Sequence, residues 1–312
     1  MAWASILNYR AFMKLLVFGL GFSALHVSQR LQLAGVHVTA TVRSRAKADE
    51  LVQAGITARV FSLDHADAQI AADIAASDAV LVSVPPSELG DPVLASFADR
   101  IAAAPNLRWV GYLSTVGVYG DHDGNWVDET TPTAPGKGRS RNRTTAEQAW
   151  LALGAHVFRL SGIYGPGRNQ LVQLASGTAR RIVKPGQTFN RIHVADIAAV
   201  IEASLARPRP GGIYNVADNE PAPPQDVVAF AAKLCGLEPP AEIPFERAEL
   251  SPMARSFYSE NRRVRNDLIR EELGVSLTYP TYREGLTALR ALGDGPAAAS
   301  SGAGNASMPL KP

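Results

Sequence analysis

The chain has 312 residues, 46% of them hydrophobic and 19% charged, and this composition excludes collagen-like, coiled-coil and wholly disordered proteins. Its length fits one large domain or two fused ones. Thirty-one Lys and Arg against 29 Asp and Glu leave a formal charge of +2, a surplus too small to indicate a nucleic-acid or anionic-membrane partner. We therefore expect a small-molecule partner. The single cysteine, Cys235, allows no disulfide within the chain and no multi-cysteine metal cluster, so no metal site is expected.

From Met13 onward, short aliphatic or β-branched runs alternate with longer Ala-rich stretches, which predicts repeated βα units on a parallel sheet. The expected strands are 14–18, 37–42, 58–62, 79–84, 108–114, 156–160 and 212–216. The clearest expected helices are 23–34, 92–103, 144–153, 194–206, 224–235 and 282–292. No stretch approaches the roughly 20 continuous apolar residues of a membrane-spanning helix, so we expect a cytoplasmic protein without a membrane partner.

The first expected strand runs directly into a glycine motif that opens the first helix. The motif is GxGxxA and consists of Gly19, Leu20, Gly21, Phe22, Ser23 and Ala24. The first glycine permits a tight turn, the second lets the backbone approach a pyrophosphate, and the small alanine allows close packing of helix on strand. Free amides at the helix start then face the phosphates. This strand-turn-helix-strand context predicts a dinucleotide site, and the alternative is that the glycines serve only the turn geometry.

The residues after the second expected strand indicate which dinucleotide is bound. Sites that prefer NAD place an acidic residue about 20 positions after the motif, where it binds the adenine ribose. Here no Asp or Glu occurs from Lys14 through Ala48. Instead Arg43, Ser44 and Arg45 follow the strand and offer donors to a ribose 2′-phosphate. NADP is therefore favoured over NAD, and the alternative is that both arginines are simply solvated.

Several further stretches give the chain a family resemblance that extends from about residue 13 to residue 292. They are LSTVGVYG at 113–120, RLSGIYGPGR at 159–168, NRIHVADI at 190–197 and IYNVA at 213–217, with Asp128-Glu129 before a Pro-rich turn. With the glycine motif, they make the chain resemble the extended short-chain dehydrogenase/reductases, the NAD-dependent epimerase/dehydratase family. The resemblance implies an α/β fold with a Rossmann-type doubly wound parallel sheet. It also implies a smaller C-terminal region over a substrate that is often a nucleotide sugar.

The resemblance also implies catalytic positions, and the chain departs from two of them. Thr115 matches the hydroxyl residue that the family places after the fifth strand. The family's Tyr-x-x-x-Lys pair on the next helix is replaced by Arg139 and Arg143, so the closest resemblance is to an atypical branch without the tyrosine. Arginine stays protonated and cannot replace a catalytic tyrosine, although Arg143 could still hold a ribose hydroxyl or a phosphate. A proton would have to come from His193, Tyr119 or a bound water.

The remaining site candidates follow from their positions in these motifs. Val84, Pro85 and Ser114 follow or end the fourth and fifth expected strands and are predicted to lie beside the cofactor. Arg139, Tyr164, Arg168 and Arg191 are predicted to contact substrate. Arg139 belongs to a basic cluster with Lys137, Arg141 and Arg143 that could bind a phosphorylated or acidic substrate. The alternatives are a solvated loop for the arginines and plain packing for the tyrosine.

The predicted organisation has four parts. Residues 1–12 form an N-terminal extension, with Met1 or Met13 as the true start, and 13–164 form the NAD(P)-binding domain, to whose sheet 190–217 return. Residues 165–292 form the substrate region, and the Gly, Ala, Ser and Pro-rich tract 293–312 is expected to be a disordered tail. The expected function is that of an oxidoreductase or epimerase acting on a phosphorylated or nucleotide-sugar-like metabolite, as a monomer or a homodimer. The alternative is an NADP(H)-binding sensor that lacks the chemistry.

Overall fold

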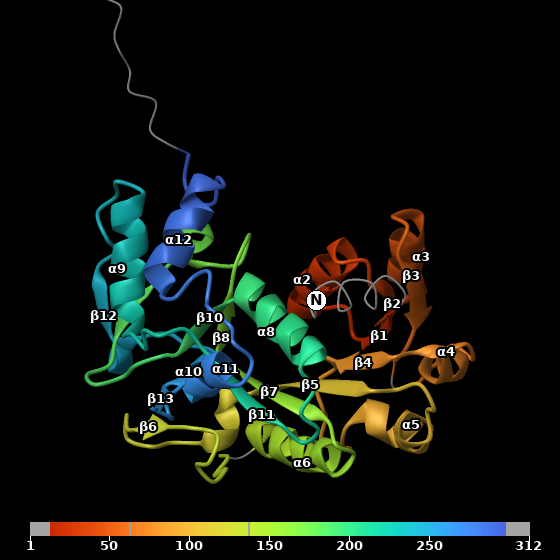
Figure 1. Cartoon of the computed structure of the whole chain (residues 1–312). Coiled ribbons are helices and arrows are strands. Elements are labelled where there is room, and N and C mark those ends of the chain that lie inside the picture. The colour runs from red at the N-terminus through yellow and green to blue at the C-terminus, as the bar shows by residue number, and fades with distance from the viewer. Residues whose placement is uncertain (1–12, 63, 137, 298–312) are drawn as a thin grey trace, which may run out of the picture.

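The computed structural model describes residues 13–62, 64–136 and 138–297, so the predicted extension 1–12 and most of the predicted tail lie outside the described residues. A seven-stranded sheet lies at the centre, with all neighbouring strands parallel and in the order β11-β7-β5-β4-β1-β2-β3 (Figure 1). The strands are β1 (Lys14–Phe18), β2 (His37–Val42), β3 (Thr57–Val60), β4 (Ala79–Val82), β5 (Trp109–Thr115), β7 (His156–Leu160) and β11 (Ile213–Val216). The strand order reverses between β1 and β4, which confirms the predicted doubly wound sheet.

The sheet is buried because helices cover both of its faces. Alternate residues of β1 enter two different cores, Leu15 and Val17 on one side and Leu16 and Phe18 on the other. The first core is closed by α2 (Phe22–Leu33) and α8 (Val194–Ala206), and the second by α4 (Ile70–Ala76), α5 (Pro92–Ala102) and α6 (Arg139–Ala152). In Figure 1, α2 and α8 lie above the sheet and α5 and α6 below it. Helix α3 (Arg45–Gln53) packs on β3 near the sheet edge.

The C-terminal region lies beside the part of the sheet that contains β7 and β11. It is built from short parallel strand pairs and helices (Figure 1). The pairs are β8 (Gly162–Tyr164) with β10 (Arg191–His193), β9 (Arg181–Val183) with β12 (Glu242–Pro244), and β6 (Trp126–Val127) with β13 (Arg263–Val264). The helices are α7 (Gln170–Ala175), α9 (Pro224–Leu234), α10 (Pro252–Phe257), α11 (Asp267–Glu271) and α12 (Tyr282–Ala291), with 3-10 turns η1 (Val116–Tyr119) and η2 (Phe245–Arg247). Of the segment 190–217, only β11 joins the central sheet.

Helix α6 begins earlier than the sequence pattern predicts. The expected helix starts at residue 144 and leaves the arginines in a loop, whereas the structure starts α6 at Arg139. Gly138, with a φ of 73°, provides the turn into the helix, and arginine is a good helix former. The apolar pattern did not reveal this first turn because its residues are polar. The arginine cluster from Arg139 to Arg143 therefore lies on a helix and not in a loop; Lys137 lies outside the described residues.

The end of the described chain also differs from the prediction of a disordered tract from residue 293. Arg290 Nη1 donates to the carbonyl oxygens of Asp294 and Pro296, at 3.3 and 2.8 Å. The Asp294 carboxylate accepts from the Gly167 amide at 3.0 Å and from Asn169 Nδ2 at 2.6 Å. These contacts fix the first residues of the tract, and 298–312 lie outside the described residues. Among the described residues, no helix is both long and apolar enough to span a membrane.

Candidate active site

The glycine loop lies at the carboxyl end of β1, beside the point where the strand order reverses. Ligands of doubly wound sheets bind at this place. Gly19 has a φ of 85°, and a Cβ added to it would fall 2.9 Å from Cγ2 of Val84, which follows β4. Gly21 has no neighbouring heavy atom within 4 Å of such a Cβ, so the space above it is open. The loop therefore requires glycine at the first position and leaves room for a ligand at the second; Pro85 lies exposed just beyond Val84.

The residues after the loop form the start of α2 as the motif predicts. Gly21 is the N-cap and gives no side-chain hydrogen bond, so the amides of Phe22 and Ser23 in the first turn have neither a side-chain cap nor an acceptor within the helix. Ala24 is fully buried against the sheet core, and Leu20 is half-buried. The positive end of α2 thus faces the open space above Gly21. These residues fit the diphosphate of a dinucleotide.

The three residues predicted to read a 2′-phosphate lie together after β2, in three different situations. Arg43 is exposed, and no ion-pair partner is found for it among the described residues. Ser44 caps α3, and its Oγ accepts from the Lys47 amide at 3.4 Å. Arg45 Nη2 pairs with Asp67 Oδ1 at 2.8 Å. Arg43 is therefore the cation best placed for a phosphate.

A hydroxyl pair lies at the carboxyl end of β5. Thr115 Oγ1 accepts from the Gly117 amide at 3.1 Å and caps η1. A Cβ added to Gly117 would lie 3.2 Å from Ser140 Oγ and 3.4 Å from Thr115 Oγ1. The two hydroxyls therefore border one small space that a side chain at position 117 would fill. The sequence analysis did not predict Ser140 as a site residue. Its position next to Arg139, which aligns with the family's tyrosine, could have indicated it.

Two of the three arginines of α6, Arg139 and Arg143, differ in their contacts. Arg139 is exposed in the first turn. Arg143 is half-buried, and its Nη1 donates to the carbonyl oxygen of Leu113 at 2.8 Å and to the Tyr112 hydroxyl at 3.3 Å. Arg143 therefore connects α6 to the backbone of β5 by hydrogen bonding, while the Arg139 side chain is exposed to solvent. The four-residue spacing places both on one face of the helix.

A buried polar network lies behind this hydroxyl pair and includes two predicted site residues, Ser114 and Tyr119. Ser114 Oγ donates to Glu147 Oε2 at 2.8 Å, and Arg159 Nη2 pairs with Glu147 Oε1 at 2.5 Å. The Tyr119 hydroxyl accepts from Arg159 Nη1 at 2.9 Å and donates to Asn215 Oδ1 at 2.7 Å. Burial raises the pKa of Tyr119 to about 12. The Tyr119 hydroxyl is buried and bonded to Asn215 and Arg159, which does not favour its predicted role as a proton donor. The Ser114 hydroxyl is likewise occupied by its hydrogen bond to Glu147.

His193 is a helix cap whose ring is enclosed by tyrosines. Its Nδ1 accepts from the Ala195 amide at 3.2 Å, and the ring centroid lies 4.0 Å from that of Tyr279 and 5.1 Å from that of Tyr164. Burial, with a smaller effect from the charge of His26, lowers the pKa of His193 to about 4. The imidazole is therefore mostly neutral at pH 7, which does not favour the predicted role of His193 as a proton donor.

Two of the four predicted substrate residues lie inside the C-terminal region. Arg191 Nη1 donates to the carbonyl oxygens of Phe189 and Ala222, at 2.9 and 3.1 Å. Burial lowers the pKa of Arg191 and raises that of Tyr164, whose hydroxyl lies 3.5 Å from the Thr281 carbonyl oxygen. Neither side chain is open to a substrate, because both are buried and turned toward the protein.

The other two, Arg139 and Arg168, are exposed. The guanidinium of Arg168 lies 5.4 Å from the ring centroid of Phe22, the first residue of α2. Arg168 therefore stands beside the start of α2, while Arg139 directly precedes Ser140, whose hydroxyl borders the same small space as that of Thr115. Among the described residues, no contact joins these two arginines.

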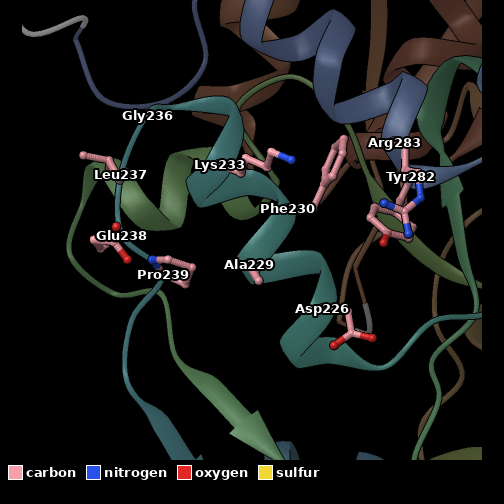
Figure 2. A pocket seen from close by; sticks show the side chains of 10 residues that line it. All are labelled: Asp226, Ala229, Phe230, Lys233, Gly236, Leu237, Glu238, Pro239, Tyr282 and Arg283. Atoms are coloured by element: carbon pink, nitrogen blue, oxygen red, sulfur yellow. The ribbon is translucent and has the colours of Figure 1, made fainter.

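A surface hollow of about 680 Å³ lies away from these residues (Figure 2). It runs along α9 and the turn that follows, and Tyr282 and Arg283 at the start of α12 border it. Figure 2 shows the Phe230 ring pointing toward these two side chains. No residue of the glycine loop or of the β5 end lines it. Among the described residues there is no group of three or more His, Cys, Asp or Glu that could hold a metal ion.

Comparison with known proteins gives the following likenesses. No family model matches the chain. A solved structure of a protein of unknown function from Silicibacter pomeroyi is 51% identical, with a TM-score of 0.81 over 89% of this chain and 98% of that one. A human epimerase family protein solved with NADPH is 19% identical, with a TM-score of 0.68 over 89% of this chain and 99% of that one, and shows the fold alone.

A curated 3-diazoavenalumate denitrifying reductase from a Streptomyces species is 29% identical over 148 residues, which cover 43% of this chain and only 46% of that protein. A structure described as a putative NAD-dependent epimerase/dehydratase from Methylobacillus flagellatus is 27% identical, with a TM-score of 0.71 over 90% of this chain and 98% of that one. That likeness extends over nearly the whole of both chains and agrees with the strand order of the sheet. In fold and over nearly its whole length, the chain is similar to this putative member of the NAD-dependent epimerase/dehydratase family.

Proposed function

We propose that the chain binds a nicotinamide dinucleotide, with NADP(H) preferred to NAD(H), and uses it as an oxidoreductase or epimerase on a small anionic metabolite. The observation that carries the proposal is the loop at the end of β1. Its first glycine is confined by Val84 and its second leaves open space before the start of α2. A dinucleotide diphosphate needs both features, a close backbone approach and free helix amides.

The preference for NADP(H) rests on Arg43. It is exposed at the end of β2, and no acidic residue lies at the end of that strand. Arg45 is already paired with Asp67, so it contributes less to an added phosphate. Replacing Arg43 by Gln is expected to weaken NADPH binding roughly tenfold or more while NADH binding stays unchanged, because a charged hydrogen bond to phosphate is lost only for NADPH. Equal affinities of the variant and the wild type for NADPH would contradict the preference.

The substrate site is proposed at the end of β5, where Thr115, Ser140 and Arg139 come from β5 and α6. Arg139 would hold a phosphate or carboxylate through the planar, forked donors of its guanidinium. The hydroxyls of Thr115 and Ser140 would donate hydrogen bonds to a neutral oxygen of the substrate. The name of the curated relative, a reductase of an organic acid, agrees with an anionic substrate.

The bound dinucleotide supplies or accepts a hydride. The chain's own side chains in this site would orient the substrate, but Thr115, Ser140 and Arg139 include no His, Asp, Glu, Lys or Tyr that could act as a general acid. After hydride transfer, the carbonyl oxygen would take its proton from a water molecule bound by the two hydroxyls, and the hydroxide formed would be neutralised by exchange with solvent. This arrangement replaces the tyrosine that the family usually places on this helix.

The test has two steps. Calorimetry with NADPH, NADP⁺, NADH and NAD⁺ first asks whether any dinucleotide binds, and a failure of all four would refute the proposal. The protein with NADPH is then exposed to sugar nucleotides, carbonyl compounds and 3-diazoavenalumate, while the nicotinamide absorbance is followed. A fall in absorbance identifies a reductase, and product analysis detects an epimerase that recycles its hydride.

The second candidate function is an NADP(H) sensor without chemistry. It is favoured by one observation, the presence of Arg139 and Arg143 at the positions of the family's tyrosine and lysine. Tight NADPH binding with constant absorbance and unchanged compounds across the panel would support the sensor. A change in the thermal unfolding midpoint on NADPH binding is expected for both functions, so only turnover separates them.

A further inference from the structure

One residue of β2 holds the backbone of the glycine loop. The Oγ1 of Thr41 accepts from the Gly19 amide at 3.0 Å, and the carbonyl oxygen of Thr41 accepts from the Leu20 amide at 3.0 Å. Thr41 is 1% exposed, so its hydroxyl is shielded from water. Two successive amides of the loop are therefore fixed by the side chain and the backbone of a single residue.

The opposite side of the loop is closed as well. Gly19 lies over Val84, whose Cγ2 would be 2.9 Å from a Cβ at position 19 and whose amide nitrogen would be 3.3 Å from it. The left-handed φ of Gly19, 85°, is a backbone conformation that favours glycine, and its amide donates to Thr41 on β2. With Val84 on one side and Thr41 on the other, the loop has little freedom to turn this amide to another acceptor. An unpaired buried amide is costly, so loss of the hydroxyl would change the loop's shape.

Thr41 also connects this loop to the end of its own strand. Arg43 follows two residues later, at the point where a 2′-phosphate is proposed to bind. The diphosphate loop and the strand end are therefore parts of one hydrogen-bonded unit.

We propose that Thr41 is a positioning residue for cofactor binding. It makes no contact with the dinucleotide itself but holds the Gly19-Leu20 turn in the shape that presents the start of α2 to the diphosphate. This inference rests on the proposed cofactor function. Because the diphosphate is common to both dinucleotides, Thr41 affects the affinity for NADPH and NADH alike, whereas Arg43 affects NADPH selectively.

The test compares three variants by calorimetry with NADPH and NADH. Thr41→Val keeps the shape of the side chain and removes the acceptor, and it is expected to weaken both affinities by the same factor, roughly three- to tenfold. Thr41→Ser keeps the hydroxyl and is expected to bind both as the wild type does. Thr39→Val is the matched control, since Thr39 lies two residues earlier on the same face of β2, and it is expected to leave both affinities unchanged.

Several outcomes would overturn the proposal. Unchanged affinities in Thr41→Val, or an equal loss in Thr41→Ser, would show that the hydroxyl does not matter. A loss for NADPH alone would place the effect at the 2′-phosphate and not at the loop. A wild type that binds neither dinucleotide would refute the cofactor function and this inference with it, whereas a binding wild type and an unaffected Thr41→Val would refute only the inference.

A measurement on the wild-type protein covers the case in which Thr41→Val does not fold. Amide hydrogen exchange reports whether the Gly19 amide is hydrogen-bonded in the free protein. The expected result is slow exchange, comparable to that of the amides of β1. Exchange as fast as in an unstructured loop would show that Thr41 does not hold the loop, and the proposal would fail.

Discussion

The buried ion pair between Glu147 and Arg159 allows a sharp prediction about stability. Replacing Glu147 by Gln is expected to lower the free energy of unfolding by about 3–5 kcal/mol, because it leaves a buried guanidinium without its counter-charge. The two side chains are only 4% and 3% exposed, for Arg159 and Glu147, so water cannot solvate the freed charge. Burial alone would lower the pKa of Arg159, but the hydrogen bonds and charge of Glu147 raise it above its usual value, so the arginine stays charged.

The assay is urea unfolding followed by circular dichroism. Glu50→Gln is the control, because Glu50 pairs with Lys47 at 2.7 Å on the surface with 67% exposure, and its loss is expected to cost less than about 0.5 kcal/mol. The double variant Glu147→Leu with Arg159→Met removes both charges and is expected to recover most of the stability. A loss below about 1 kcal/mol in Glu147→Gln would refute the reasoning, since the pair would then be no stronger than a surface pair.

Three further predictions concern single substitutions. Gly19→Ala is expected to abolish measurable dinucleotide binding in calorimetry, because Gly19 has a φ of 85° and an added Cβ would fall 2.9 Å from Val84 Cγ2; retained affinity would contradict this. Gly285→Ala in α12 would gain about 1 kcal/mol from helix propensity, yet it is expected to destabilise in urea unfolding because the new methyl meets the Tyr164 hydroxyl, and a gain would refute the clash. Burial raises the pKa of Asp218 to about 8, so the folded form keeps a proton that the unfolded chain loses above its usual pKa of 3.8. Wild-type stability should then fall by about 1.4 kcal/mol per pH unit between these values relative to Asp218→Asn, and parallel pH profiles of the two proteins would contradict this.

The central sheet and the glycine loop could be predicted from sequence because both depend on local patterns. The apolar runs of β1 and β4 predict strands that are covered on both faces. The GxGxxA motif can be interpreted from the strand before it and the helix after it. The start of α6 could not be predicted in this way. Its first turn carries polar residues from Arg139 onward, so no apolar period marks it, and Gly138 reads equally well as part of a loop.

The direction of individual side chains was the part that sequence could not supply. Tyr119 belongs to a motif beside the site, yet its hydroxyl bonds to Asn215, which is 96 positions away. His193 lies at the predicted strand-to-helix turn, but tyrosines from other segments surround its ring, and burial lowers its pKa. Such contacts depend on tertiary packing and not on spacing. Ser140 was missed for the same reason, since only the fold brings it to Thr115.

The arginines at the start of α6 are expected to lower the stability of the free protein, and this effect can be measured. Cations near the positive end of a helix destabilise it, and α6 has no acidic residue in its first turn to offset Arg139. Arg139→Gln is therefore expected to stabilise the free protein by about 0.3–1 kcal/mol in urea unfolding at low ionic strength, with the gain disappearing at high salt.

A bound anion should reverse the order of the two proteins. Inorganic phosphate is expected to raise the unfolding midpoint of the wild type more than that of Arg139→Gln when chloride at equal ionic strength serves as the reference. The exposed Arg100→Gln is the control, because Arg100 lies in the last turn of α5 and belongs neither to the glycine loop nor to the start of α6. The proposed role of Arg139 in anion binding would be refuted if Arg139→Gln were less stable than the wild type at low salt. It would also be refuted if phosphate raised the unfolding midpoints of all three proteins equally. Such a result would show that Arg139 destabilises the free helix and stabilises the protein with an anion bound. This pattern is expected of a binding residue whose charge is neutralised only by its ligand.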